Sequence, residues 1–370
     1  MTCIVGVIVN PVAGMGGKVG LKGTDGREAL RRARELGAQP IAPQRVLQAL
    51  GRLKDASEQI TIIAPPGHMG EREVRAAGLQ AEALDMVVGD ETTSADTVAA
   101  AEEMLRRGVD LLLFGGGDGT ARDIYNAVGD AVPVIGVPAG VKMHSAVFAT
   151  DPWAAGDLAL GFLRGEVCTV REAEVMDIDE EAFRAGRVSA KLYGHLRVPQ
   201  SRLMQDLKSG SSTDEGAALV GMAAYVAQMM QEGVHYLVGP GTTTRAVMDH
   251  LDLQNSLLGV DVICDGRLMI ADANEAQLLE VARNEPAHIL VTPIGGQGYI
   301  FGRGNQQISA EVIRAVGAGN LWVLATKGKI LSLDRKPFLV DTGDLEVNDM
   351  LRGYVQVIMD YRQETVYRVR

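Results

Sequence analysis

Short apolar runs alternate with amphipathic stretches through the first 150 residues. The runs contain few charged residues and are typical of strands buried on both faces of a parallel sheet; they lie at 2–9, 60–64, 83–88, 110–114 and 132–137. The stretches between them, such as 27–36 and 45–54, have helical periodicity. This alternation predicts an α/β fold with a Rossmann-like parallel-sheet domain over residues 1–150, in which ligands bind at the carboxyl ends of the strands.

The pattern changes after residue 151. Apolar and polar side chains alternate over 187–199, which predicts an antiparallel strand with one face in water. Strands and helices then alternate again, and the stretch 321–370 is strand-rich by propensity. We therefore expect a second domain over 151–370 that is β-rich and carries an α/β insertion at about 207–290.

One junction between a strand and a helix organises the first domain. The apolar run Leu111–Phe114 leads into glycines 115–117 and 119, with Asp118 between them, and a helix is predicted from Thr120. Glycines let backbone N–H groups approach a ligand closely, and a helix N-terminus attracts phosphate. A carboxylate there repels phosphate, so Asp118 is expected to accept a proton or hold a cation. The alternative is a solvated turn residue without a role.

Two further loops follow strands of the first domain. The loop 10–26 is long and glycine-rich, which favours a substrate-binding loop with Asp25 near the ligand over a flexible hairpin. The loop after 132–137 contains Lys142, His144 and Ser145. Lys142 is the better candidate for neutralising phosphate, whereas His144 fits a packing role equally well.

A second junction of the phosphate-binding type occurs in the other half of the chain. The strand 236–238 is followed by a loop rich in glycine and threonine, and then by a helix from Arg245. The possible phosphate-binding residues are Gly241, Thr242, Thr243 and Arg245. The alternative is that the threonines act only as cap and turn residues. Glycine-rich turns at 295–298 and 302–305 carry no assigned role.

Composition narrows the classes of function. A chain of 370 residues is long for one core, and a net charge of −11 argues against binding to nucleic acid or an anionic membrane surface. The three cysteines are far apart, so their spacing predicts neither a disulfide framework nor a thiolate metal site, and metal ligands stay unknown. With no long apolar segment and no basic leader, the expected location is cytoplasmic.

The motifs also carry a family resemblance. Gly-Gly-Asp-Gly-Thr at 116–120, after a buried strand, resembles the signature shared by NAD kinases and relatives of diacylglycerol and sphingosine kinases. Asn-Pro-Val-Ala-Gly-Met-Gly-Gly at 10–17, Gly-Thr-Asp-Gly at 23–26 and Ala-Arg-Asp at 121–123 resemble the ATP-NAD kinase family, including its acetoin-catabolism X-type branch. Many lipid kinases continue the signature with Asn-Glu, where this chain has Arg122-Asp123.

The resemblance implies a phosphotransferase that uses ATP and Mg²⁺, with NAD or a similar small molecule as acceptor and Asp118 as the catalytic proton acceptor. The nucleotide-binding residues that we expect are Asn10, Gly14, Gly16, Asp25, Gly116, Gly117, Gly119, Thr120, Arg122, Asp123, Lys142 and Ser145. A pyrophosphate would meet one or more of Lys18, Lys22, Arg122 and Lys142, while Asp25 or Asp123 accepts from a ribose hydroxyl. We also expect a homo-oligomer. The alternatives are a lipid kinase and a non-catalytic nucleotide sensor.

Overall fold

The computed structural model describes residues 3–21, 27–56, 60–141, 143–178, 190–201, 203–204, 216–256 and 258–370. Lys22, Asp25 and Lys142, which the sequence analysis named, lie outside these residues. The chain divides into two compact units. The first comprises Met1–Met15, Gly23–Arg31 and Gln39–Leu207, and the second comprises Gly16–Lys22, Arg32–Ala38 and Lys208–Arg370.

A five-stranded parallel sheet forms the centre of the first unit. Its strands are β1 (Cys3–Val9), β2 (Ile60–Ala64), β3 (Glu82–Ala83), β4 (Leu111–Gly116) and β5 (Val134–Pro138). Their order is β3-β2-β1-β4-β5, and every neighbouring pair is parallel. The strand order reverses between β1 and β4, which is the place where open α/β sheets bind ligands. The predicted α/β class with an N-terminal parallel sheet is confirmed.

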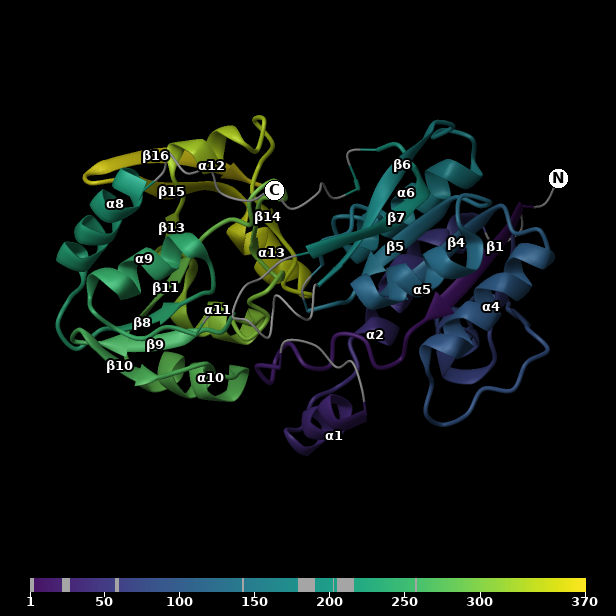
Figure 1. Cartoon of the computed structure of the whole chain (residues 1–370), viewed down its shortest axis with the longest axis horizontal. Coiled ribbons are helices and arrows are strands. Elements are labelled where there is room, and N and C mark those ends of the chain that lie inside the picture. The colour runs from purple at the N-terminus through teal and green to yellow at the C-terminus, as the bar shows by residue number, and fades with distance from the viewer. Residues whose placement is uncertain are drawn as a thin grey trace. The chain divides into compact units, whose positions relative to one another are not determined.

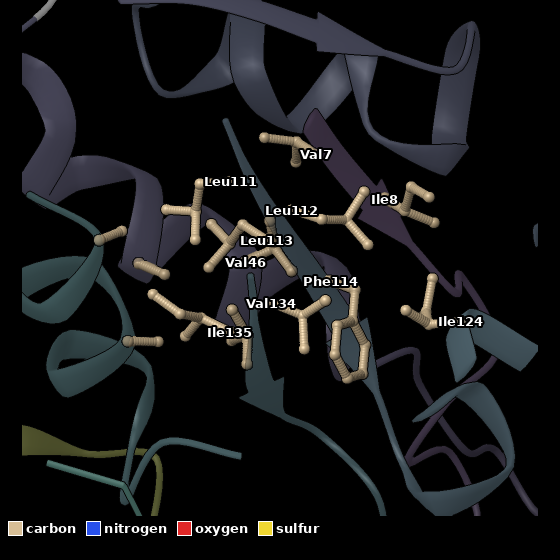
Figure 2. Close-up of a cluster of buried hydrophobic side chains, with 14 of the residues drawn as sticks. Val7, Ile8, Val46, Leu111, Leu112, Leu113, Phe114, Ile124, Val134 and Ile135 are labelled. Atoms are coloured by element: carbon tan, nitrogen blue, oxygen red, sulfur yellow. The ribbon is translucent and has the colours of Figure 1, made fainter. Parts of the chain in front are cut away.

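The core of the first unit explains why the central apolar run becomes a strand. Leu111, Leu112, Leu113 and Phe114 of β4 are fully buried, and Figure 2 shows them among side chains of β1 and β5. Removing one such side chain from water contributes about 1.5–3 kcal/mol. A Cβ on Gly115 would lie 2.2 Å from the side chain of Val46, so this glycine lets a helix pack against the strand.

Helices surround this sheet, as Figure 1 shows for the part of the chain coloured purple to teal. They are α2 (Ala42–Leu50), α3 (Glu71–Ala76), α4 (Ser94–Arg106), α5 (Asp118–Val128) and α6 (Pro152–Leu163), whereas α1 (Arg27–Glu35) is divided between the two units. Helix α4 begins with a capping box between Thr93 and Asp96, which satisfies N–H groups that a helix end leaves unpaired. Gly156 of α6 faces the Ala49 carbonyl of α2 so closely that a Cβ there would lie 2.3 Å from it.

The first unit extends beyond residue 150, where the sequence analysis placed the domain boundary. Helix α6 and the antiparallel hairpin of β6 (Val170–Ile178) and β7 (Ala190–Pro199) belong to it. Ala173 and Val175 of β6 and Leu196 and Val198 of β7 are fully buried in the same core as the parallel sheet. In β7, the buried Leu196 and Val198 alternate with the exposed His195 and the partly buried Arg197, so this part of the strand has one wet face as predicted. Leu192 is exposed, contrary to the alternation, and 187–189 lie outside the described residues.

The second unit contains a seven-stranded mixed sheet, which confirms the predicted sheet-rich region. The strands, in spatial order, are β10 (Arg267–Ile270), β9 (Asp261–Cys264), β8 (His235–Val238), β11 (Ala287–Val291), β13 (Leu321–Leu324), β15 (Gly353–Asp360) and β16 (Gln363–Val369). Strands β8, β11, β13 and β15 are parallel, while β9, β10 and β16 run antiparallel to their neighbours. A separate ladder joins β12 (Tyr299–Phe301) to β14 (Leu339–Val340).

Helices α8 (Gly216–Met229) and α9 (Thr242–His250) share one apolar cluster of this sheet, and α10 (Glu275–Asn284), α11 (Ala310–Val316) and α13 (Leu345–Leu351) share another. The alternation of strands and helices thus continues past residue 290, where the predicted insertion ended. The strand-rich prediction for 321–370 misses α12 (Lys327–Leu331) and α13. Thr326 and Asp344 cap these two short helices through their side-chain oxygens.

In the described parts of the chain, no helix is long and apolar enough to cross a membrane.

Candidate active site

The ends of β1 and β4 are joined by Asn10. Its backbone N–H donates to the Gly115 carbonyl at 2.9 Å, and its Nδ2 donates to Thr120 Oγ1 at 3.0 Å. Its Oδ1 accepts from the Val12 N–H, which shapes the turn after β1. A Cβ on Gly116 would lie 2.3 Å from Thr120 Oγ1, so only glycine fits there. The beginning of the first glycine loop and the loop 115–120 lie at the same edge of the sheet, as predicted.

A third loop, after β5, approaches the same glycines. A Cβ on Gly140 would lie 2.8 Å from the Gly117 Cα. Gly14 has φ of +81°, and a Cβ there would lie 2.1 Å from the Ala139 carbonyl oxygen. The three loops therefore meet backbone to backbone, which side chains would prevent.

Asp118 is the first residue of α5 and is 5% exposed. Its Oδ2 accepts from the His144 N–H at 2.7 Å and lies 3.1 Å from His144 Nδ1. Its Oδ1 accepts from the Ser145 N–H at 3.0 Å and from Ser145 Oγ at 2.6 Å. Asp118, which the sequence analysis expects to accept a proton or hold a cation, therefore also anchors the loop after β5.

Ser145 connects this anchor to the hairpin. Its Oγ lies 2.9 Å from the Met176 carbonyl oxygen and accepts from the Met176 N–H at the same distance. Ser145 is fully buried. The Ser145 hydroxyl therefore joins α5 to β6. The hairpin's contribution was not foreseen, because nothing in the apolar pattern of 166–177 identifies which backbone groups face a serine.

Arg122 supplies positive charge on α5. Burial lowers its pKa, but the charge of Asp177, the Tyr193 hydroxyl and the charge of Asp123 raise it, and the net pKa lies above the ordinary value for arginine. Its Nη1 lies 2.7 Å from Asp177 Oδ2, and its side chain is 36% exposed. Its Nε lies 3.9 Å from Asp123 Oδ1. The guanidinium remains charged, and an anionic ligand would compete with Asp177 for it.

The remaining predicted residues are distributed over both units. Gly119 lies within α5, and Asp123 is 8% exposed on the same helix. Gly16 and Lys18 fall in the second unit, where Lys18 Nζ lies 3.1 Å from Glu275 Oε1. Lys18 is therefore already paired with a carboxylate.

The predicted junction in the second unit contains a lysine that the sequence analysis missed. Gly241 precedes α9, and Thr243 near its start is 2% exposed. Lys329 Nζ of α12 donates to Thr243 Oγ1 and to Thr292 Oγ1, each at 2.9 Å. Thr292 directly follows β11, and Lys329 lies in α12, a few residues after the end of β13. Both strands are parallel to β8, and this shared strand-end position is the signal that could have identified them.

The arginine at that junction has a different position. Arg245 is exposed, and its Nε lies 3.4 Å from Asp249 Oδ2 one turn further along α9. An exposed pair of this kind contributes little, about 0.3–0.5 kcal/mol. Lys329 therefore binds the threonines directly, whereas Arg245 contacts Asp249.

The described residues do not form a resident metal site. Within them, no group of three or more histidine, cysteine, aspartate or glutamate residues could hold a metal ion. Both carboxylate oxygens of Asp118 face hydrogen-bond donors rather than open space. The residues present therefore do not fit a Mg²⁺ ion bound by the protein alone.

Comparison with known protein families covers both halves of the chain. Residues 5–167 match the ATP-NAD kinase N-terminal domain, and residues 231–369 match the ATP-NAD kinase C-terminal domain. The chain belongs to the ATP-NAD kinase family, which confirms the resemblance found in its motifs. Both matched domains support a kinase-type phosphotransferase acting on a small molecule.

No curated protein matches the sequence significantly. Among solved structures, a putative diacylglycerol kinase from Bacillus anthracis str. Sterne is similar with a TM-score of 0.26 and 15% identity, over 48% of this chain and 46% of that one. The chain thus spans slightly under half of that relative. The S. aureus MnaA-UDP co-structure has a TM-score of 0.25 and 11% identity, over 88% of this chain and 80% of that one. Likenesses this weak carry no argument about function.

Proposed function

We propose that this protein transfers a phosphoryl group from ATP, or another phosphate donor, to a hydroxyl of NAD or a related small molecule. The observation that carries the proposal is the pair of ATP-NAD kinase domains, with Asp118 of the first placed where the strand order of the sheet reverses. Ligands of open α/β sheets bind at this position.

The start of α5 suits a phosphate group. Gly117 precedes the helix without a side-chain cap. The N–H groups of Gly119 and Thr120 have no acceptor among the described residues. Unpaired N–H groups at a helix N-terminus, together with the positive end of the helix dipole, attract anions. Arg122 one turn further along adds a charged guanidinium.

NAD is the acceptor that the family favours. Its pyrophosphate would bind the glycine loops and Arg122, and Asp123 of α5 would accept a hydrogen bond from a ribose hydroxyl. Asn10, Gly14, Gly116, Gly117 and Thr120 would shape the nucleotide site through the contacts described above. The cytoplasmic location and the homo-oligomer stay predictions.

The family also implies Mg²⁺. Since the described residues do not form a metal site, the ion would be held mainly by the phosphate oxygens of the nucleotide, as is usual for Mg²⁺ in phosphoryl transfer. Its chemistry would be the neutralisation of phosphate charge.

We also propose that the start of α9 in the second unit binds phosphate, through Gly241, Thr242, Thr243 and Arg245. The Lys329 ammonium beside Thr243 supports this proposal by adding positive charge. Lys329→Met should weaken the binding of inorganic pyrophosphate in calorimetry by about tenfold, as expected for the loss of a charged hydrogen bond. Lys336→Met, elsewhere in the same unit, is the control, and equal affinity in both variants would contradict the proposal.

A panel of acceptors tests the main proposal. Purified protein is incubated with ATP, Mg²⁺ and NAD, other nucleotides, sugars or a short-chain diacylglycerol, and mass spectrometry identifies phosphorylated products. Product from NAD or another soluble compound supports the proposal. Product from diacylglycerol alone would instead indicate a lipid kinase. Binding of ATP or NAD without any product would indicate a nucleotide sensor.

A further inference from the structure

The second unit contains a cavity away from the junction at the start of α9. Its volume is about 320 Å³, which is within the range of small-molecule sites. Its lining comes from the end of α8, the residue that follows α9, and the end of β9 with the turn to β10. Because β8 and α9 meet at Gly241–Thr242, the cavity lies at the opposite ends of these two elements from the proposed phosphate site.

The lining of this cavity is more apolar than polar. Its apolar side chains belong to Ala227, Met230, Leu251 and Ile263. Ile263 is buried in the core, and the other three are partly buried. The unbranched thioether of Met230 adapts to ligands of different shape. The apolar part of a ligand would leave water on entering this cavity, which favours binding.

A buried hydroxyl at the cavity has a donor that is not used. Tyr236 lines the cavity and is 1% exposed. Its Oη accepts from the N–H of Gln231, another lining residue, at 2.7 Å. A tyrosine hydroxyl can donate as well as accept, and within the described residues its proton has no acceptor. Buried donors are normally paired, so a ligand that brings an oxygen acceptor would complete this group.

The tyrosine is held in place for such a contact. Its ring stacks on His288 with the ring centroids 5.6 Å apart, and it packs against Trp322 at 5.4 Å. Burial raises the pKa of the Tyr236 hydroxyl, so this group keeps its proton at neutral pH. Binding therefore needs little ordering of the side chain that donates the hydrogen bond.

The charged residues of the lining are acidic. Glu232 and Asp265 line the cavity and are exposed, and no lysine, arginine or histidine lies among the described residues of the lining. Asp265 Oδ1 accepts from the Gly233 N–H at 2.8 Å, which holds this carboxylate at the turn. Its negative charge and that of Glu232 repel anions. A cation would lose its water among the apolar side chains, which is costly.

We propose that this cavity binds an uncharged small molecule with an apolar body and a carbonyl oxygen that accepts a hydrogen bond from Tyr236 Oη. The apolar side chains bind the body of the ligand, the tyrosine fixes its orientation, and the two carboxylates exclude anions. The site is separate from the proposed phosphotransferase chemistry, and binding to it can be measured without turnover.

Three probes of similar size test the proposal on the full chain. Acetophenone has a carbonyl acceptor, ethylbenzene has no polar atom, and benzoate carries a negative charge. The ¹³C-methyl NMR signal of Met230, identified by its loss in Met230→Leu, reports binding in protein labelled at the methionine methyl groups. We expect acetophenone to shift this signal saturably and to bind about 3- to 10-fold more tightly than ethylbenzene, the gain expected from one hydrogen bond. Benzoate should not shift it.

Two variants assign the contacts. Tyr236→Phe keeps the ring but removes the donor, so the affinity for acetophenone should fall to that for ethylbenzene. Tyr354→Phe, at an exposed position of the same unit, is the control and should change neither affinity. Ala227→Leu should fill the cavity and abolish the binding of both probes. Ala224→Leu, one turn earlier on α8 and outside the lining, should leave binding intact.

Each contrary result has a definite meaning. No saturable shift with any probe, or binding that survives Ala227→Leu, would overturn the site. Equal affinities for acetophenone and ethylbenzene in the wild-type protein, or an acetophenone affinity unchanged in Tyr236→Phe, would overturn the role of the tyrosine and with it the proposed ligand class. Binding of benzoate as tight as that of acetophenone would contradict the exclusion of anions.

Discussion

Removal of the Ser145 hydroxyl should destabilise the first unit strongly. The hydroxyl donates to the Asp118 carboxylate at 2.6 Å and accepts from the Met176 N–H at 2.9 Å, at a fully buried position. A hydrogen bond to a charged group contributes about 1.5–3 kcal/mol, and a buried N–H that loses its acceptor costs about 1–3 kcal/mol. Met176 is only partly buried, so the lower end applies to its N–H.

We therefore expect Ser145→Ala to lower the free energy of unfolding of the first unit by about 3 kcal/mol. For a unit of this size, that loss corresponds to a fall in Tm of about 6–12 °C. The loss should appear in the urea midpoint at an unchanged m-value.

The two tryptophans make the measurement specific. Trp153 lies on α6 in the first unit and Trp322 on β13 in the second. In a Trp322→Phe background, the fluorescence of Trp153 follows the unfolding of the first unit. Ser94→Ala, at an exposed position in the first turn of α4, is the control and should change stability by less than about 0.5 kcal/mol. A loss below about 1 kcal/mol in Ser145→Ala would refute the reasoning, because the network would then contribute no more than one neutral hydrogen bond.

Three further changes probe the first unit. Arg122→Ala should weaken NAD binding about tenfold in calorimetry, while Asp177→Asn, which removes the nearest negative charge from the guanidinium, should tighten it. The same direction of change in both variants would argue against a phosphate contact at Arg122. Burial raises the pKa of the Glu73 carboxyl, so the folded state disfavours its charged form, and Glu73→Gln should stabilise the protein above a pH of about 4.3 by about 1.4 kcal/mol per pKa unit of the shift. This gain in stability should vanish below that pH, and a gain that is independent of pH would contradict the linkage. Glu82→Gln, at an exposed position, is the control. Gly140→Ala should lower the free energy of unfolding by about 1–3 kcal/mol, since its Cβ would lie 2.8 Å from the Gly117 Cα. Gly51→Ala, which has open space around it, should leave the stability unchanged. Equal stability of the two variants would contradict the close approach of the loops.

Local sequence signals predict the centre of the first unit well. The run Leu111–Phe114 and the glycines after it define a strand and a turn within a dozen residues, and the parallel order places the end of β1 beside them. Because β1 and β4 end side by side, Asn10 after β1 lies close enough to donate a hydrogen bond to Thr120. Such features need only the period of the pattern and the rule that parallel strands end together.

Contacts between distant parts of the sequence could not be predicted in this way. Asp118 meets the loop after β5, and Thr243, Thr292 and Lys329 come from three separate strand ends. Helix α12 is too short for a periodic pattern to reveal it. The resemblance identified Asp118 as the proton acceptor, but only the hydrogen bonds around it show how completely its oxygens are engaged.

The most direct test of the account follows the γ-phosphoryl group itself. The wild-type protein and Asp118→Asn are incubated with ATP labelled at the γ-phosphate, Mg²⁺ and NAD, and the label in NADP is measured while tryptophan fluorescence confirms that both proteins are folded. The account predicts label in NADP for the wild-type protein and a loss of about 100-fold or more in Asp118→Asn, because the amide cannot accept a proton. Transfer to NAD that is within a few fold in both proteins would contradict the role of Asp118, and no transfer to any acceptor would contradict the phosphotransferase function.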